Sequence, residues 1–187
     1  MIRLEILDNE DFNTEYSLCK QCGGKCCKKN ACDCSPDDFD NNIEKMRQAL
    51  KSGNYTIDFS REDASSFIFE NNEIILETER VRKNPMEFFY IRPKNINRPI
   101  VDFIHTEDIE GPCIFWNKDN GCPFEYKKRP KGGRTMVPFS EGNCIMQYNK
   151  VFMIREWKPY EEELIQMVKE FYDSNWKIYK ELNFKIR

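Results

Sequence analysis

Short apolar runs bounded by polar turns fill the middle of the chain. Residues 55–92 contain YTIDF, SFIF, EIILETE and FFYIR, separated by charged or asparagine-rich turns such as residues 70–73. Runs of this length, rich in aromatic and β-branched residues, are typical of β-strands. The pattern predicts a small antiparallel sheet.

The end of the chain has a helical pattern. After Pro159 apolar residues recur every three or four positions, at Leu164, Val168, Phe171, Ile178 and Leu182. This spacing predicts a long C-terminal helix of roughly twenty residues. Acidic residues near its start and lysines toward its end complement the helix dipole.

A second helix is predicted to begin at Ser35-Pro36. Ser35 suits the N-cap, Pro36 the first helical position, and acidic residues fill the first turn. The apolar face of this helix is formed by Ile43, Met46, Ala49 and Leu50, and Gly53 ends it.

Two segments lack a regular period. Residues 19–34 show neither a helical nor a strand pattern, and residues 93–144 hold most of the prolines and glycines, with PIVDFI and GPCIFW as candidate short strands. We therefore expect one α+β domain over residues 1–187, with a small antiparallel sheet, a few helices and two loop-rich regions brought together.

Composition narrows the class of protein. The chain has 187 residues, 40% of them hydrophobic, with 29 basic and 32 acidic residues and a net charge of −3. Because the charges are interspersed, nucleic acid is not the expected partner. No apolar run reaches the roughly 18 residues of a membrane span, so we expect a cytoplasmic protein without a membrane partner.

Cysteines supply the candidate chemistry. Six of the nine lie between residues 19 and 34. Structural disulfides are rare in a reducing cytosol and an odd number cannot pair completely, so ligation of a metal ion or iron–sulfur cluster is favoured. Cys19 and Cys22 have the Cys-x2-Cys spacing of a metal-binding turn. Gly23 and Gly24 allow the backbone to bend and to aim N–H groups at sulfur.

Cys26 and Cys27 are adjacent. In an extended segment their side chains would point to opposite sides, which suits two centres, or one centre and a separate contact. Cys113, Cys122 and Cys144 are distant in sequence but able to close a site across the fold. A metal held this way would clamp the two segments and add to folding stability.

The identity of the metal stays open. The paired Cys-x2-Cys knuckles of structural zinc sites are not both present, and the spacing differs from the usual ferredoxin run. We favour an iron–sulfur cluster, of the 4Fe-4S type, over zinc.

The run Cys19-x2-Cys22-x3-Cys26-Cys27 resembles the signature of the CxxCxxxCC family, the YkgJ-like proteins described as zinc- or iron-chelating domains. The resemblance continues through Cys113, Cys122-Pro-Phe-Glu and Arg129-Pro130 and covers about two thirds of the chain. Many members have a cysteine shortly after Arg-Pro, where this chain has Gly133.

That departure resembles a subgroup in which Arg-Pro-x-Gly-Gly-Arg is followed by a later cysteine. The resemblance implies that Cys34 is the extra thiol. The implied ligands are Cys19, Cys22, Cys26, Cys27, Cys32, Cys113, Cys122 and Cys144. Eight thiols suit two four-thiolate centres, or one cluster with spares. The related flagellin lysine N-methylases imply that such a module can belong to an enzyme that modifies proteins.

Other residues have competing interpretations. Arg129, Gly132, Gly133 and Arg134, with Lys131, could bind an anionic cofactor or substrate, but a structural turn that supports the metal loop is favoured. His105, the one histidine, could be a ligand or general base, and a surface or turn position is favoured. Trp116 and Trp157 flank the second cysteine region and could shield a metal from water.

We therefore expect a metal-binding protein whose iron–sulfur cluster or zinc serves structure, redox chemistry or sensing. The alternatives are a cluster-dependent enzyme that modifies a protein or small molecule, and a zinc-stabilised binding module.

Overall fold

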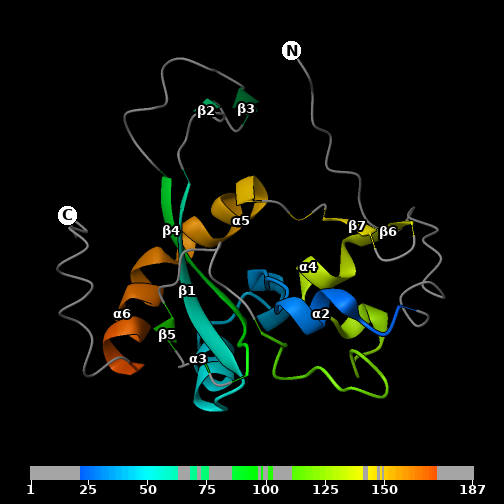
Figure 1. The fold of residues 1–187 in the computed structure, drawn as a ribbon. Coiled ribbons are helices and arrows are strands. Elements are labelled where there is room, and N and C mark those ends of the chain that lie inside the picture. The colour runs from blue at the N-terminus through cyan, green and yellow to red at the C-terminus, as the bar shows by residue number, and fades with distance from the viewer. Residues whose placement is uncertain are drawn as a thin grey trace.

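A small sheet separates a layer of helices from a loop-rich region that carries most of the cysteines (Figure 1). The computed structural model describes residues 22–62, 68–70, 73–75, 86–96, 98, 101–102, 111–140, 143–146, 148 and 150–171. Within them no helix is both long and apolar enough to cross a bilayer.

The main sheet has three strands. Its central strand, β1 (Tyr55–Glu62), pairs antiparallel with β4 (Met86–Pro93) and parallel with β5 (Val101–Asp102). Two further antiparallel pairs are formed by β2 (Ile68–Glu70) with β3 (Glu73–Ile75), and by β6 (Met136–Ser140) with β7 (Asn143–Met146). The predicted small antiparallel sheet and the α+β class are confirmed. The β6–β7 hairpin was not predicted.

The register gives the β1–β4 pair two different faces. Ile57 lies opposite Ile91 and Phe59 opposite Phe89, so one face is apolar. Alternate residues project to the other face, where Thr56 pairs with Arg92 and Asp58 with Tyr90. Both faces are covered, because Ile57, Ile91, Asp58 and Arg92 are all buried.

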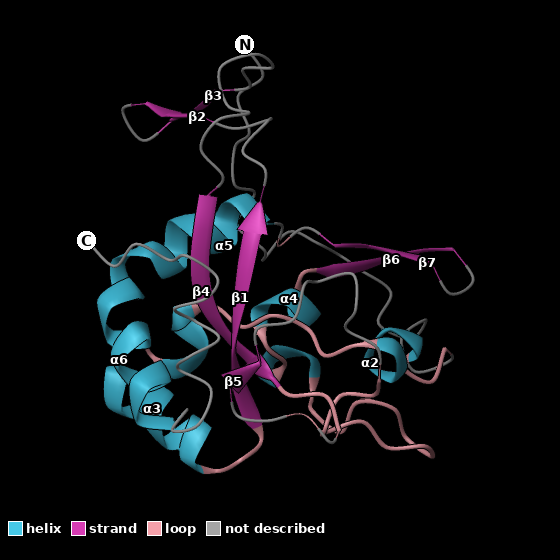
Figure 2. Cartoon of the chain, turned by 60° about the vertical axis from the view of Figure 1, so that its left-hand side comes forward, coloured by secondary structure: helices cyan, strands magenta, loops and turns pink. Residues whose placement is uncertain are grey.

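Among the described elements, three helices pack against the β1–β4 pair. α5 (Lys150–Trp157) and α6 (Glu161–Phe171) contact β4, and α3 (Ile43–Lys51) contacts β1. A short 3-10 turn, η6 (Lys158–Tyr160), joins α5 to α6. Figures 1 and 2 both place α6 on one side of β1 and β4 and α2 (Lys25–Lys29) on the other. The long C-terminal helix is confirmed through Phe171, and its predicted continuation lies outside the described residues.

The helices and sheet share one hydrophobic core. Trp157 is fully buried and its ring packs against those of Phe39 and Tyr160. The other fully buried side chains of the core include Met46, Leu50, Ile57, Phe88, Tyr90, Ile91, Met153, Leu164, Met167 and Val168.

The helix predicted from Ser35 begins there, with Ser35 as N-cap and Pro36 as its first residue, but it is not continuous. Residues Pro36–Phe39 form a separate 3-10 turn, η2, followed by left-handed residues at Asp40 and Asn41. α3 begins afresh, with the Asn42 side chain accepting a hydrogen bond from the Lys45 N–H. The Ser35 hydroxyl has no hydrogen-bond partner among the described residues; its backbone N–H donates to the Asp38 carboxylate instead.

We call residues 22–34, 94–96 and 111–135 the cysteine lobe. It contains α2, the 3-10 turn η5 (Tyr126–Lys128) and α4 (Lys131–Arg134). The prediction that residues 19–34 form only loop was wrong, because α2 is a helix. Among the described residues the lobe has two isolated β-bridges. One joins Asn95 to Cys113, which lies in the run GPCIFW, and the other joins Asn117 to Gly121 across a tight turn.

Candidate metal centre

Cys26 and Cys27 lie next to each other on α2. Successive residues of a helix are rotated by only about 100°, and the two Sγ atoms are 4.0 Å apart. The inference that this pair points to opposite sides was therefore wrong, because it assumed an extended backbone. Both thiols can contribute to one centre.

The second cysteine segment meets this pair directly. The Cys27 thiol interacts with the Cys122 side chain as well as with that of Cys26, and both interactions affect its pKa. The backbone N–H of Cys113 donates to the Cys27 carbonyl oxygen at 2.8 Å. Thiols from the two cysteine-containing segments thus converge on α2.

The three thiols share their protons unequally. The hydrogen bond from Cys27 lowers the pKa of Cys26 and that of Cys122 to about 6 each, with a smaller contribution from the nearby Arg129 guanidinium. The same two contacts, together with burial, raise the pKa of Cys27. Because the Cys27 thiol carries a single proton, it can donate to only one of these sulfurs at a time, and the cluster is predisposed to hold thiolate.

Cys32 and Cys113 border this cluster. Burial raises the pKa of Cys32, and the charges of Cys113, Asp33, Cys122 and Cys26 raise it further. Burial likewise raises the pKa of Cys113, with Cys122 contributing. Cys26, Cys27, Cys32, Cys113 and Cys122 are therefore close enough for their charges to interact.

Two glycines allow the segments to approach. Gly121 has φ +69°, and a Cβ there would lie 3.0 Å from the Gly23 carbonyl oxygen. Gly24 has φ +70°, and its Cβ would lie 3.3 Å from the Gly121 Cα. Any side chain at Gly121 would push the Cys22–Gly24 turn away from Cys122. The Trp116 indole N–H, which donates to the Gly23 carbonyl at 3.4 Å, also joins the two turns.

Backbone N–H groups act on several of the thiols. Those of Phe115 and Trp116 lower the pKa of Cys113, which burial raises overall, and that of Phe124 lowers the pKa of Cys122. The Trp116 N–H itself donates to the Cys113 carbonyl oxygen at 2.8 Å. Donors of this kind stabilise thiolate and tune metal–thiolate sites. Sequence reasoning assigned this role to Gly23 and Gly24, whereas these N–H groups belong to the residues that follow each cysteine.

The residues predicted to bind a cofactor lie against the Cys32 side of the lobe. Gly132 donates its N–H to the Asp33 carbonyl at 2.9 Å, and a Cβ at Gly133 would lie 3.1 Å from the Cys32 sulfur. The Gly133 N–H donates to Pro130. These glycine N–H groups are thus bonded within the protein.

The nearby arginines also make contacts inside the protein. Arg134 donates to the Asp38 carboxylate at 2.6 Å and to the Arg129 carbonyl. The Arg129 Nε donates to the Phe124 carbonyl at 3.3 Å, beside Cys122. The cofactor-binding hypothesis for these residues remains a prediction.

A buried polar network lies between the sheet and the lobe. The Arg92 Nε donates to Asp58 at 2.8 Å, and Arg92 Nη1 donates at 2.9 Å to the Asn95 side-chain oxygen, which also accepts the Ala31 N–H. Arg92 Nη2 and Asn95 Nδ2 are buried donors without a partner among the described residues. Asn95 lies opposite Cys113 in an isolated β-bridge. These amino groups of Asn95 and Arg92 therefore lie on the sheet side of the cysteine cluster. Nothing in the sequence pattern singled out Arg92 or Asn95.

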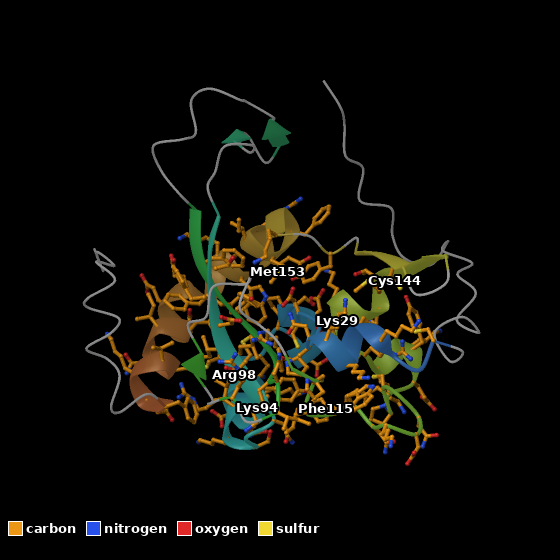
Figure 3. All side chains as sticks on the ribbon, in the orientation of Figure 1. Lys29, Lys94, Arg98, Phe115, Cys144 and Met153 are labelled. Atoms are coloured by element: carbon orange, nitrogen blue, oxygen red, sulfur yellow. The ribbon has the colours of Figure 1, made fainter. Side chains whose placement is uncertain are left out.

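The other predicted residues are distributed as follows. Cys22 lies in the turn before α2 and Cys144 is exposed on β7, on the right of Figure 3. Cys34 is buried, and its carbonyl accepts the Trp157 indole N–H at 2.9 Å, so Trp157 belongs to the core. Cys19 and His105 lie outside the described residues.

The donor set fits a soft metal. Among the described residues no three Cys, His, Asp or Glu side chains are already arranged to hold a metal ion. The groups that converge are nonetheless all sulfur, with N–H donors around them, and thiolate sulfur is the ligand that zinc and iron–sulfur clusters prefer.

Comparisons with known proteins add no assignment: no family model, no curated protein and no solved structure matches this chain. The resemblance to the CxxCxxxCC family remains a prediction from the Cys19–Cys27 run.

Proposed function

We propose that this protein binds metal through its cysteines, holding an iron–sulfur cluster in preference to zinc between α2 and residues 113–122. The observation that carries the proposal is the contact of the Cys27 thiol with both Cys26 and Cys122. Soft ligands from two distant segments meet at one point, as a metal-clamped site requires. Cys32 and Cys113 border the same point and complete the described donor set.

The centre would serve a structural, redox or sensing role. When bound, a cluster supplies a one-electron couple whose potential depends on hydrogen bonds to sulfur and on solvent exposure. The chain's own residues would hold it: Cys26, Cys27 and Cys122 as ligands, and the N–H groups after Cys113 and Cys122 as donors to sulfur. Arg129 would offset negative charge beside Cys122.

The direct test is purification of the whole chain without oxygen, followed by visible spectroscopy and analysis of iron, sulfide and zinc. We expect a brown protein with stoichiometric iron and sulfide. A colourless protein with bound zinc would replace the cluster by a zinc-stabilised module, and a protein free of both would contradict the proposal.

Single cysteine variants locate the ligands. Cys27→Ser and Cys122→Ser are expected to lose most of the bound metal. The matched control is Cys34→Ser, because Cys34 is buried beside Trp157 and is the thiol predicted to be spare. Retention of metal by Cys27→Ser at the wild-type level would refute the site. Cys144→Ser tests whether the exposed thiol on β7 is a ligand.

A further inference from the structure

The cysteine lobe is strongly basic although the chain as a whole is acidic. Within residues 22–34, 94–96 and 111–135 there are ten Lys or Arg and three Asp or Glu, a formal charge of +7. Since the whole chain carries −3, the rest carries −10. The fold therefore gathers charges that are mixed along the sequence, and the expectation that no one-signed surface exists needs revision for this lobe.

Some of the basic residues are neutralised internally. Lys131 pairs with Glu156 and Asp37, and Arg134 pairs with Asp38. Lys128 pairs with the exposed Glu125 at 3.0 Å. Lys131 and Arg134 thus attach the lobe to its surroundings, whereas the Lys128 pair lies within it.

A second set of lysines faces solvent. No ion pair joins any of them to another described residue. They are Lys25, Lys28, Lys29, Lys118 and Lys127, all exposed, with the half-buried Lys94. On α2 the spacing of Lys25, Lys28 and Lys29 puts them on neighbouring positions of one helix face, turned away from Cys27. Figure 3 labels Lys29 on α2 and Lys94 beyond the end of β4.

We infer that the exposed lysines of the cysteine lobe dock an acidic segment of a partner protein. The solvent-facing cations of the lobe are lysines, whereas Arg92, Arg129 and Arg134 make contacts inside the protein. Hydrated, mobile lysines suit a transient electrostatic encounter, whereas arginine forks suit tight phosphate recognition.

The surroundings also favour a compact acidic patch over a long polyanion. The described residues outside the lobe carry a formal charge of −5, so a nucleic acid strand that extended beyond the lobe would meet net negative charge there. Apolar docking has little support, because among the described residues the exposed large apolar side chain is Ile96, at 40%. Small, polar interfaces of this kind are typical of transient redox and signalling contacts.

The test measures binding of fluorescein-labelled decaglutamate to the whole protein by anisotropy, at low salt and at about 0.15 M. The variant Lys25→Gln/Lys28→Gln/Lys29→Gln is expected to bind about five- to tenfold more weakly at low salt. The matched control, Lys45→Gln/Lys51→Gln/Lys158→Gln, changes the net charge equally but on the helical layer, and is expected to bind like wild type. A further variant, Lys118→Gln/Lys127→Gln, removes positive charge from the lobe outside α2. Weaker binding of decaglutamate by this variant could not be caused by a folding defect in α2.

Three outcomes would overturn the inference. These are no binding of decaglutamate by wild type, equal weakening in the control, and tighter binding of a ten-phosphate oligothymidylate than of decaglutamate, which would indicate nucleic acid. The inference goes beyond the proposed metal centre and does not require it. Metal content measured on the same samples keeps a failure of docking separate from a failure of the centre.

Discussion

Helix α6 and the cysteine lobe lie on opposite sides of the same two strands but are held by different interactions. Against Ile57, Phe59, Phe89 and Ile91 the helices bring large apolar side chains, and the contact is a continuous core. Such packing is non-directional and scales with the area removed from water.

The lobe is attached mainly by directional contacts. Asp38 illustrates this, because its carboxylate accepts hydrogen bonds from the backbone N–H groups of Ser35 and Lys131 and from the Arg134 side chain. Arg92 does the same on the sheet, toward Asp58 and Asn95. Directional contacts fix geometry but contribute little net stability each. The comparison indicates that burial of apolar surface stabilises the core. The lobe is instead ordered by specific hydrogen bonds and ion pairs and by its proposed metal.

The largest expected effect comes from the side chain that joins the two regions. Arg92→Leu leaves the buried Asp58 carboxylate without its cation, and we expect a loss of about 3–5 kcal/mol in the free energy of unfolding. Urea unfolding followed by circular dichroism measures it. The double variant Arg92→Leu/Asp58→Leu should recover part of the loss, because no unpaired charge remains.

The same variant has a predicted pH dependence. Burial raises the pKa of Asp58 above its usual 3.8, although Arg92 opposes the shift. Without Arg92 the pKa rises further, so the folded variant binds a proton more readily than the unfolded chain does. Its stability deficit should therefore shrink as the pH falls toward 4. A deficit that grows on acidification would contradict an unpaired carboxylate as its cause.

Metal removal should destabilise the cysteine lobe more than the core. If a centre binds α2 and residues 113–122, stripping it with a chelator removes about 2.7 kcal/mol of stabilisation at a hundredfold excess of metal over the dissociation constant. Native-state hydrogen exchange should show faster exchange in the lobe, while β1, β4 and α6 keep their protection. Uniform loss of protection would mean that core and lobe unfold as one unit.

The regular part of the fold could be predicted because its periodicity is local. Strands β1 and β4 and the helix through Leu164 and Val168 were expected from alternation and from helical spacing. α2 was missed because a five-residue helix rich in cysteine and lysine has no apolar stripe. Its helical geometry, and hence the orientation of Cys26 and Cys27, comes from packing against residues 111–122.

The sequence predicted which residues form the candidate site but not how they are arranged. Cysteine count and spacing pointed to Cys26, Cys27 and Cys122, which do meet. The supporting residues could not be found in this way, since Gly121 and Arg92 act through a close approach and a buried network that exist only in the folded chain. The charge asymmetry was missed for the same reason.

Gly121→Ala tests whether backbone contact orders the lobe. The new Cβ would meet the Gly23 carbonyl at 3.0 Å in a left-handed conformation, and we expect a loss of about 1–3 kcal/mol together with weaker metal retention. Gly53→Ala is the matched control, because Gly53 has φ +75° but nothing within 4 Å of its Cβ position. It should lose stability through the backbone alone and keep its metal. Equal metal loss in both variants would remove the contact with Gly23 as the explanation.

The smallest effects should come from two lysines close together in the lobe. Lys131→Gln removes partly buried pairs with Glu156 and Asp37 and a cation–π contact with Tyr148, so we expect it to cost about 1 kcal/mol. Lys128→Gln removes an exposed pair with Glu125 and should cost less than about 0.5 kcal/mol. Chemical unfolding of both variants in parallel gives the difference. If Lys128 proved as costly as Lys131, exposure would not decide how much an ion pair contributes to the stability of the lobe.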